Sequence, residues 1–531
     1  MAEVQSDPSA AAPASATDEP ALRPQWLTSF DPNSYALVRF LFLRLLGLIY
    51  AVAFLVAVNQ ILPLIGSHGL EPAADFLELV KVELGTDRAY FRLPTLFWIA
   101  DSDAALLAAA WVGLALSAAL LCGFANSITL FVLWILYLSI IHVGQVFWGY
   151  GWESLLVETG FLAMFLAPPL ALRPFSNGES PPKVVIWLLR WLLFRLMLGA
   201  GLIKIRGDEC WRDLTCLFTY FETQPLPNPL SPYFNQLPHW VNKGGVLFNH
   251  YAELVAPFMV FGPRRLRLVG GISIIAFQTM LIVSGNLSWL NWLTITVAVA
   301  CFDDRALLAV APAKLRARWH HLARAHLLPK ARLIAVIVLA ILVGVLSINP
   351  VVNLFSSRQT MNGSFDPLQL VNTYGAFGSV SRERDEIIIE GTNDEDPEQA
   401  SWSPYEFRCK PGDPERRPCV VAPYQYRIDW QMWFAAMSTP RQHPWIVHLV
   451  YKLLLGDRAM LSLLAHNPFP EHPPRYVRAD LYHYELTRFA DKTSAYWKRE
   501  KVGQYLPAIS VDEPVLLQFL RRHRWAVDES P

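Results

Sequence analysis

Three side chains that can take part in chemistry lie close together in the segment RWLLFRLMLGAGLIKIRGDECWRDLTC, residues 190–216. Lys204 ends an apolar stretch, and burial lowers the pKa of a lysine so that its amine can act as a general base. Cys210 and Cys216 follow, and two nearby thiols can form a structural disulfide or exchange electrons. The segment therefore offers a candidate catalytic base and a candidate dithiol.

Four cysteines form two closely spaced pairs. Cys210 and Cys216 enclose CWRDLTC, and Cys409 and Cys419 enclose CKPGDPERRPC. Both spacings predict local structural disulfides, since neither is the CxxC spacing of thioredoxin-like catalysts. A redox-active Cys210–Cys216 pair and free thiols remain as alternatives. The cysteines and histidines lack zinc spacing, so we assign no metal and no cofactor. The two other cysteines lie in or at apolar runs and are expected to be inert core residues: Cys122 and Cys301.

The elements that must position these groups are membrane spans. Of the 531 residues, 53% are hydrophobic and only 17% are charged, against roughly 25% in a typical soluble domain. The net charge is zero, so nothing indicates nucleic-acid binding. Apolar runs reach the length of about 18–20 residues that crosses a bilayer. We expect an α-helical polytopic membrane protein with about eight or nine transmembrane helices, from candidates at 36–58, 104–122, 126–147, 152–170, 184–205, 246–262, 267–285, 287–301 and 331–348. The sixth candidate is short and polar and is expected to be re-entrant.

Basic residues predict which ends of these helices face the cytoplasm. Segment 302–332 holds seven Lys and Arg residues, and segment 262–267 holds three arginines. We expect both in the cytoplasm, together with a disordered N-terminal tail. The expected organisation is a tail at 1–35, a multispan part at 36–348 with external loops 59–103 and 206–245, and an external C-terminal domain at 349–531.

The C-terminal third is polar and contains no further span long enough to cross a bilayer. Residues 384–391 predict a strand, and residues 476–489 alternate between apolar and polar as a strand does. Residues 405–409 and 419–422 flank a turn-rich stretch and predict a hairpin. We expect a mainly β domain that carries some helices.

Charged residues inside apolar helices are costly and need partners. At about 1.5 Å per residue, Glu158 and Arg195 lie at depths that a long arginine can bridge, so we expect them to pair. Lys204 is expected near Glu153 at the external rim. The alternative is that the basic side chains snorkel or bind backbone carbonyls. Lys204 and Arg190 project within about 40° of each other, as membrane anchors or as a site for an anionic lipid head group.

Several long motifs resemble the lipase maturation factor family, over most of the chain after about residue 140. They include WESLLVETGFLAMFLAP (152–168), the segment 190–216, ETQPLPNPLSPY (222–233) and YEFRCKPGDPERRPCVVAPYQYRIDWQMWFAAM (405–437). The resemblance implies assistance to the folding of secreted lipases, with the C-terminal domain contacting exported clients, and it supplies no catalytic residues. Animal members are membrane proteins of the endoplasmic reticulum with about five spans. The short loops and alanine-rich N-terminus here look bacterial, which favours a bacterial inner membrane.

Two other functions stay open. The sequence AGLIKIRGDECW (200–211) is faintly similar to vitamin K-dependent carboxylases, which implies a multispan membrane enzyme acting through Lys204, and a thiol enzyme would act through Cys210 and Cys216. A transporter would need a polar path, for which the candidates are Arg195, Glu158, His250, Glu253 and Gln278. The leading hypothesis is a membrane-anchored maturation factor for exported proteins, by resemblance lipases.

Overall fold

The computed structural model describes residues 35–171, 181–314, 328–491 and 493–525. The predicted tail 1–35, apart from Tyr35, and the centre of the basic segment 302–332 lie outside the described residues.

Among the described residues, five helices are long and apolar enough to cross a membrane, which confirms a helical multispan protein. They coincide with five of the nine candidate spans and comprise α1 (Ala36–Ile65), α4 (Asp103–Cys122), α7 (Lys183–Gly207), α13 (Arg264–Ser284) and the consecutive helices α17 (Lys330–Leu346) and α18 (Ile348–Phe355).

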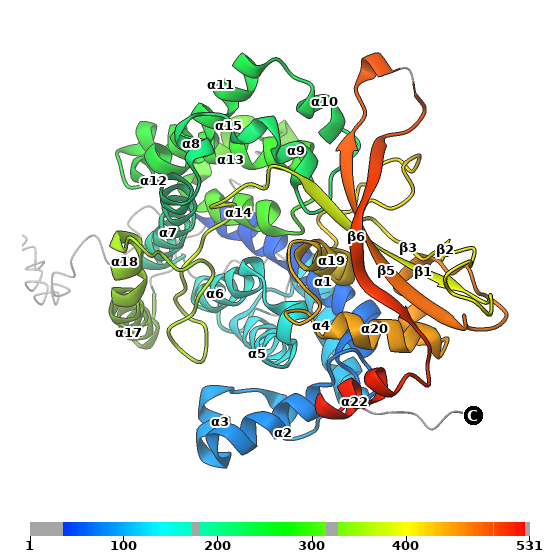
Figure 1. The fold of residues 1–531 in the computed structure, drawn as a ribbon. Coiled ribbons are helices and arrows are strands. Elements are labelled where there is room, and N and C mark those ends of the chain that lie inside the picture. The colour runs from blue at the N-terminus through cyan, green and yellow to red at the C-terminus, as the bar shows by residue number, and fades with distance from the viewer. Residues whose placement is uncertain (1–34, 172–180, 315–327, 492, 526–531) are drawn as a thin grey trace, which may run out of the picture.

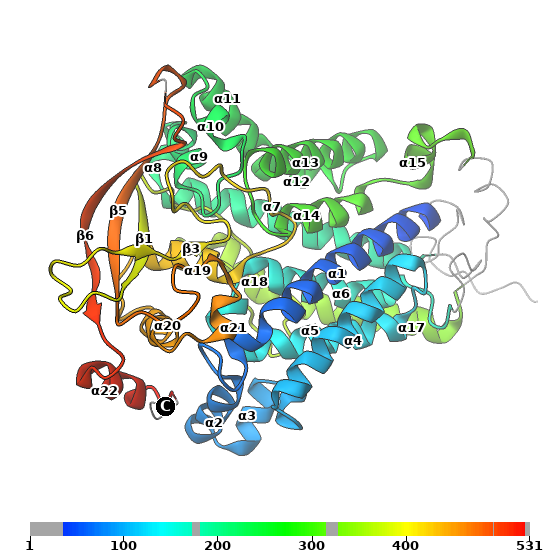
Figure 2. The same ribbon diagram turned by 90° about the vertical axis from the view of Figure 1, so that its right-hand side faces the viewer.

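Three other candidate spans form shorter apolar helices. These are α5 (Ser127–Val143), α6 (Gly151–Leu166) and α14 (Leu290–Ala298), which the turn η5 (Val299–Cys301) extends. Helix α6 packs between α5 and α7, and α14 contacts α1, α6 and α7, so α6 and α14 lie inside the bundle (Figure 2). Turn and loop helices are η1 (Leu96–Trp98), α2 (Ala73–Leu84), α3 (Thr86–Arg92), η2 (Gln145–Trp148), α8 (Glu209–Arg212), η3 (Cys216–Phe218), α9 (Tyr220–Thr223), α10 (Ser231–Asn235), α15 (Asp304–Val310) and η6 (Phe489–Asp491).

The sixth candidate span is a broken helix. Helix α11 (His239–His250) runs into a π-helical turn, η4 (Tyr251–Val255), and continues for one turn as α12 (Ala256–Met259). Pro257 follows the π-turn and has no backbone N–H to offer to a regular helix. Such π-turns rotate side chains out of the regular helical register, and here the turn contains the acidic residue Glu253.

The two ends of the bundle differ in character. At one end, Arg264 and Arg267 bind Asp303, and Arg332 donates to the carbonyl of Ala167 at 2.6 Å. The N-terminal end of α1 lies there too, since Asp304 accepts its first backbone N–H groups. At the opposite end lies the C-terminal part of the chain (Figure 2). Arg264, Arg267 and Arg332 therefore lie at the end of the helices opposite to the C-terminal part.

The C-terminal part is built on an antiparallel sheet of order β2-β1-β5-β6. Its strands are β1 (Arg384–Thr392), β2 (Ser403–Pro404), β5 (Tyr476–Leu486) and β6 (Trp497–Ile509). Strands β1 and β5 coincide with the strands predicted from the sequence. Helices α19 (Arg427–Ala436) and α20 (Trp445–Leu454) lie between the sheet and the membrane helices (Figure 1), and α21 (Arg458–Leu461) and α22 (Pro514–Arg522) complete this part.

The predicted hairpin around KPGDPERRP is wrong. The short strand β3 (Glu406–Phe407) pairs instead with the distant β4 (Leu464–His466), and residues 419–422 form no strand. Prolines at 411, 414 and 418 interrupt the stretch and remove backbone donors that a hairpin ladder requires. The intervening chain is closed by a disulfide rather than by strand pairing.

The start of α1 offers a stability test. Asp304 accepts hydrogen bonds from the backbone N–H groups of Ala36, Leu37 and Val38 at 2.8, 2.9 and 3.1 Å, so it caps a helix that begins far away in sequence. Losing a side-chain cap costs roughly 1–2 kcal/mol. We expect Asp304→Ala to lower the melting temperature of the purified protein and Asp304→Asn, which retains an acceptor oxygen, to lower it less. Equal losses for the two variants would contradict the capping role.

Candidate functional site

Lys204, the candidate base, is one half of a buried ion pair. Its ammonium nitrogen lies 2.7 and 2.9 Å from the two carboxylate oxygens of Glu253 and 2.8 Å from Oδ1 of Asn249. The π-turn presents Glu253 to α7, and Asn249 precedes it by one helical turn on α11. The three donors of the ammonium therefore already have acceptors, and Lys204 stands as a structural cation in this geometry.

The expectation that Lys204 lies near Glu153 is wrong. Glu153 binds Arg427 of α19 at 2.8 Å instead, and it also accepts from the hydroxyl of Tyr137. Sequence reasoning missed both partners, because the π-turn that delivers Glu253 has no sequence signature of its own. The sequence does show that Glu253 lies in the apolar run 246–262. A buried carboxylate there is costly and requires a cationic partner.

Arg427 joins the C-terminal part to the membrane helices. Its fully buried guanidinium donates to Glu153 and, at 2.6 Å, to the carbonyl of Phe147, and it lies 4.0 Å from the ring centroid of Trp148. The backbone N–H of Arg427 donates to Gln60 Oε1 of α1 at 2.9 Å. One residue of α19 thus contacts three separate segments of the bundle.

The structure brings Arg195 and Glu158 together in a buried ion pair. A loop from the C-terminal part completes this pair. Arg195 donates to the carbonyl of Asn372 at 2.6 Å, and Glu158 Oε2 accepts from the Asn372 backbone N–H at 3.0 Å and from the Tyr374 hydroxyl at 2.8 Å. Helical periodicity predicts partners on helices and not in loops, so the roles of Asn372 and Tyr374 are not apparent from the sequence.

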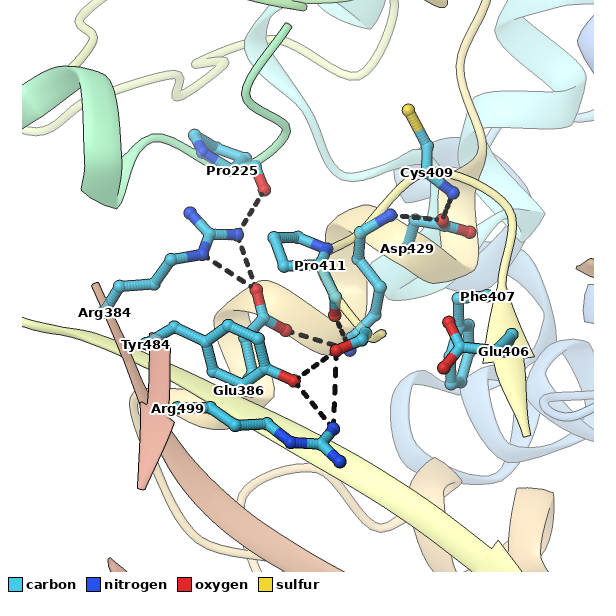
Figure 3. Close-up of polar contacts among 12 residues, drawn as sticks. Pro225, Arg384, Glu386, Glu406, Phe407, Cys409, Pro411, Asp429, Tyr484 and Arg499 are labelled. Carbon is cyan, nitrogen blue, oxygen red and sulfur yellow. Dashed lines mark hydrogen bonds and ion pairs between the residues drawn. The ribbon is translucent and has the colours of Figure 1, made fainter. Parts of the chain in front are cut away.

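A third buried cluster lies at the base of the sheet (Figure 3). Arg384 and Glu386, both on β1, are joined by a hydrogen bond of 3.0 Å from Nε, and Lys410 lies 2.9 Å from the other oxygen of Glu386. Arg384 also donates at 3.0 Å to the carbonyl of Pro225, in the loop that follows α9. The cluster therefore fastens the sheet to the loop after α9 on one side and to the disulfide segment on the other.

Both predicted disulfides are present. Cys210 and Cys216 have a Cα–Cα distance of 4.7 Å and are buried among Trp211, Tyr220 and Phe221. The second pair has a Cα–Cα distance of 5.5 Å and closes the proline-rich loop: Cys409 and Cys419. Of the other two cysteines, Cys301 is buried as expected, whereas Cys122 is exposed at the last turn of α4 and is no core residue.

A cavity of about 410 Å³ lies between the membrane helices and the C-terminal part. Met197, Ala200 and Lys204 of α7 line it on one side, and Phe277 and Gln278 of α13 contribute a second wall. The loop 374–381 and helix α19 also line it. Of the charged side chains that the sequence singled out within the spans, Lys204 lines the cavity. Glu153, Glu158 and Arg195 are absent from its described lining.

These features define a polytopic membrane protein in which a C-terminal β part is fixed to a helical bundle by buried charges. The chain belongs to the lipase maturation factor family. The model described as "Lipase maturation factor transmembrane domain" matches residues 37–309, and "Lipase maturation factor C-terminal domain" matches residues 370–507. The resemblance noted from the sequence motifs is thereby confirmed.

Similarity to individual relatives extends over nearly the whole chain. Lipase maturation factor 1 of Bos taurus is 45% identical over 526 residues, which cover 94% of this chain and 93% of the relative. The Homo sapiens protein of that name is 43% identical over 98% of this chain and 95% of its own length. Lipase maturation factor 2 of Xenopus tropicalis is 30% identical over 92% of this chain and 84% of its own length. No solved structure matches the chain significantly.

Replacing Arg427 should weaken the attachment of the C-terminal part to the membrane helices and lower the stability of the protein. Arg427→Ala leaves Glu153 buried without its cation, and breaking a buried pair in this way costs about 3–5 kcal/mol. We expect a large loss of folded protein after heating, measured by fluorescence-detected size exclusion in detergent. The exposed Arg441 provides a matched control, Arg441→Ala, which should behave as the unaltered chain. An Arg427→Ala protein as heat-resistant as this control would contradict the role.

Asp429 predicts a pH-dependent stability. Its Oδ1 accepts from the backbone N–H groups of Cys409 and Lys410 at 2.6 and 2.9 Å, yet burial raises the pKa of its carboxyl to about 6. The folded protein therefore holds this proton more tightly than the unfolded chain. The resulting stabilisation is present below about pH 4 and is lost as the pH rises through about 6.

Asp429→Asn keeps an acceptor for both N–H groups but carries no charge. We expect this variant to melt at a higher temperature than the unaltered protein at pH 7.5, with the difference shrinking toward pH 4.5. Asp429→Ala should melt lower at both pH values, because two buried donors lose their acceptor. A difference between the Asn variant and the unaltered protein that does not vary with pH would refute the assignment.

Proposed function

We propose that this chain is a membrane-anchored maturation factor that assists the folding or assembly of exported lipases. The observation that carries the proposal is the 43–45% identity to proteins named lipase maturation factor 1 over more than nine-tenths of both chains. The similarity covers the membrane helices and the C-terminal part alike. We infer that both parts are needed for the activity.

The end of the bundle that carries Arg264, Arg267 and Arg332 faces the cytoplasm in this proposal, following the excess of basic residues on cytoplasmic loops. The C-terminal part then lies in the periplasm or the lumen, where exported clients fold and where both disulfides are stable. The membrane is a bacterial inner membrane or, in a eukaryote, that of the endoplasmic reticulum.

The C-terminal sheet supplies a surface for clients. Strand β6 is an edge strand of thirteen residues, most of them exposed. An edge strand has unpaired backbone groups that can bind an extended segment of another chain. Its residues Lys498, Arg499 and Lys501 place charged side chains along this edge, and the two lysines pair with Asp491 and Asp480. Charged side chains on an edge strand limit indiscriminate strand pairing.

The geometry around the candidate catalytic groups favours this function over an enzyme. Lys204 is paired with Glu253, and Cys210 is bonded to Cys216. Each of these side chains has a structural partner that accounts for its position.

The proposal is tested by expressing a secreted lipase in cells that lack lipase maturation factor 1, with and without this chain. We expect the chain to raise lipase activity per amount of secreted lipase several-fold while lipase transcript stays constant. A co-expressed exported enzyme of another class serves as the control and should not change. Unaltered lipase specific activity, with the chain present in the membrane at normal abundance, would refute the proposal.

The same assay separates a maturation factor from an enzyme that uses Lys204. Lys204→Met combined with Glu253→Gln removes both buried charges together and leaves side chains of similar size, so the fold should persist. We expect the double variant to support lipase maturation as well as the unaltered chain. Loss of maturation by a variant of normal abundance and melting temperature would instead assign a chemical role to the amine.

A further inference from the structure

We propose that the cavity between the membrane helices and the C-terminal part binds a neutral, hydroxyl-bearing lipid with one acyl chain, of the monoacylglycerol class. Its size is that of a ligand site, since such sites commonly enclose roughly 300–1,000 Å³ and this one encloses about 410 Å³. The inference concerns a bound small molecule and holds independently of the client that the protein serves.

The cavity offers its ligand a mostly apolar wall. Aromatic and aliphatic side chains from both parts of the molecule line it, among them Met197, Phe221, Phe277, Leu281 and Trp430. Such a wall favours a hydrocarbon body, because transferring apolar surface out of water is favourable at about 25 cal/mol per Å².

Charge balance within the wall selects a neutral ligand. Lys204 and Glu253 are the charged residues of the described lining, and they bind each other at 2.7 Å. Their charges cancel inside the cavity, so an ionised head group would be buried without a counter-ion. Burial of an unpaired charge is far more costly than burial of a hydroxyl.

Three amides in the wall call for a hydrogen-bonding group on the ligand. Gln224, Gln278 and Asn291 are 2%, 5% and 1% exposed, and the side-chain oxygen of each has no hydrogen-bond partner among the described residues. A buried acceptor without a partner costs about 1–3 kcal/mol. A hydroxyl both donates and accepts, so it satisfies either orientation of an amide.

The accessible part of the lining points to the bilayer as the source of the ligand. Met280, on the membrane helix α13, lines the cavity and is 45% exposed. It precedes the end of α13 at Ser284 by one turn, about 6 Å along the helix axis. This height corresponds to the boundary between hydrocarbon and head groups, where a single-chain lipid keeps its hydroxyls.

The neighbouring helix α11 supports this placement. Asn249 and Gly245 of α11 line the cavity, while Trp240 and Leu247 on the same helix are 76% and 55% exposed. Exposed tryptophan is typical of the membrane interface. The wall of the cavity thus includes a helix whose exposed side chains are of the kind found at the membrane interface, where a single-chain lipid resides.

The test uses the full chain in phosphatidylcholine nanodiscs and monooleoylglycerol that carries a photoactivatable diazirine on its acyl chain. We expect saturable labelling of peptides from α7, α13 or α14 that line the cavity. Unlabelled monooleoylglycerol should compete at least threefold better than methyl oleate, which has no hydroxyl, and better than anionic oleate. Unsaturable labelling spread over lipid-facing helix surfaces, or equal competition by the three compounds, would overturn the proposal.

Two variants test whether Gln278 and Asn291 accept a hydrogen bond from the hydroxyl of the lipid. Gln278→Leu and Asn291→Leu should each weaken monooleoylglycerol binding about three- to tenfold, the value of one hydrogen bond, and leave methyl oleate binding unchanged. Thr279→Leu, on the exposed side of the same helix, is the matched control and should bind both as the unaltered chain does. Unchanged discrimination between the two lipids in both folded variants would overturn the assignment. Because no lipase is present, this outcome is independent of the maturation assay.

Discussion

The buried contact between Arg427 and Glu153 is the constraint on which the arrangement of the two parts depends. Each group lies where water cannot reach it, so neither can be left alone without a penalty of several kcal/mol. Glu153 belongs to the bundle and Arg427 to the C-terminal part, and the pair therefore fixes one part against the other. The directed ion pair thus adds a specific contact to the apolar packing between the two parts.

Buried charged residues also link the two parts at two other places. Asn372 and Tyr374 complete the ion pair of Arg195 and Glu158, and Arg384 reaches from the sheet to the loop after α9. In all three cases a charged group buried in one part binds a group of the other part: an opposite charge for Arg427, and neutral hydrogen-bonding groups at the other two places. Buried charged residues thus contribute directly to the attachment of the C-terminal part to the bundle.

The sequence predicts those features that depend on local composition or depth. Hydropathy locates the five long helices, the residues of 384–391 and the alternation in 476–489 predict β1 and β5, and helical rise brings Glu158 within reach of the long side chain of Arg195. It does not reveal partners that depend on irregular backbone.

Lys204 illustrates that limit, because a π-turn turns Glu253 toward it and no propensity predicts such a turn. The pairing of β3 with β4 is likewise set by distant packing rather than by the intervening residues. The cavity also lies beyond prediction, since its walls come from segments between 149 and 437 that only the fold brings together.

The loop that carries Asn372 and Tyr374 has a consequence for how the protein is made. Ribosomes synthesise chains from the N-terminus, so α6 and α7 enter the membrane long before residues 372–374 have been translated. During that interval Glu158 and Arg195 have each other but lack the donors and carbonyl that later enclose them. The bundle therefore reaches its final packing only after residues 372–374 have been synthesised and have docked onto α6 and α7. Membrane insertion and completion of the C-terminal part are therefore one assembly event, and a chain that stops early remains unfinished within the bilayer itself.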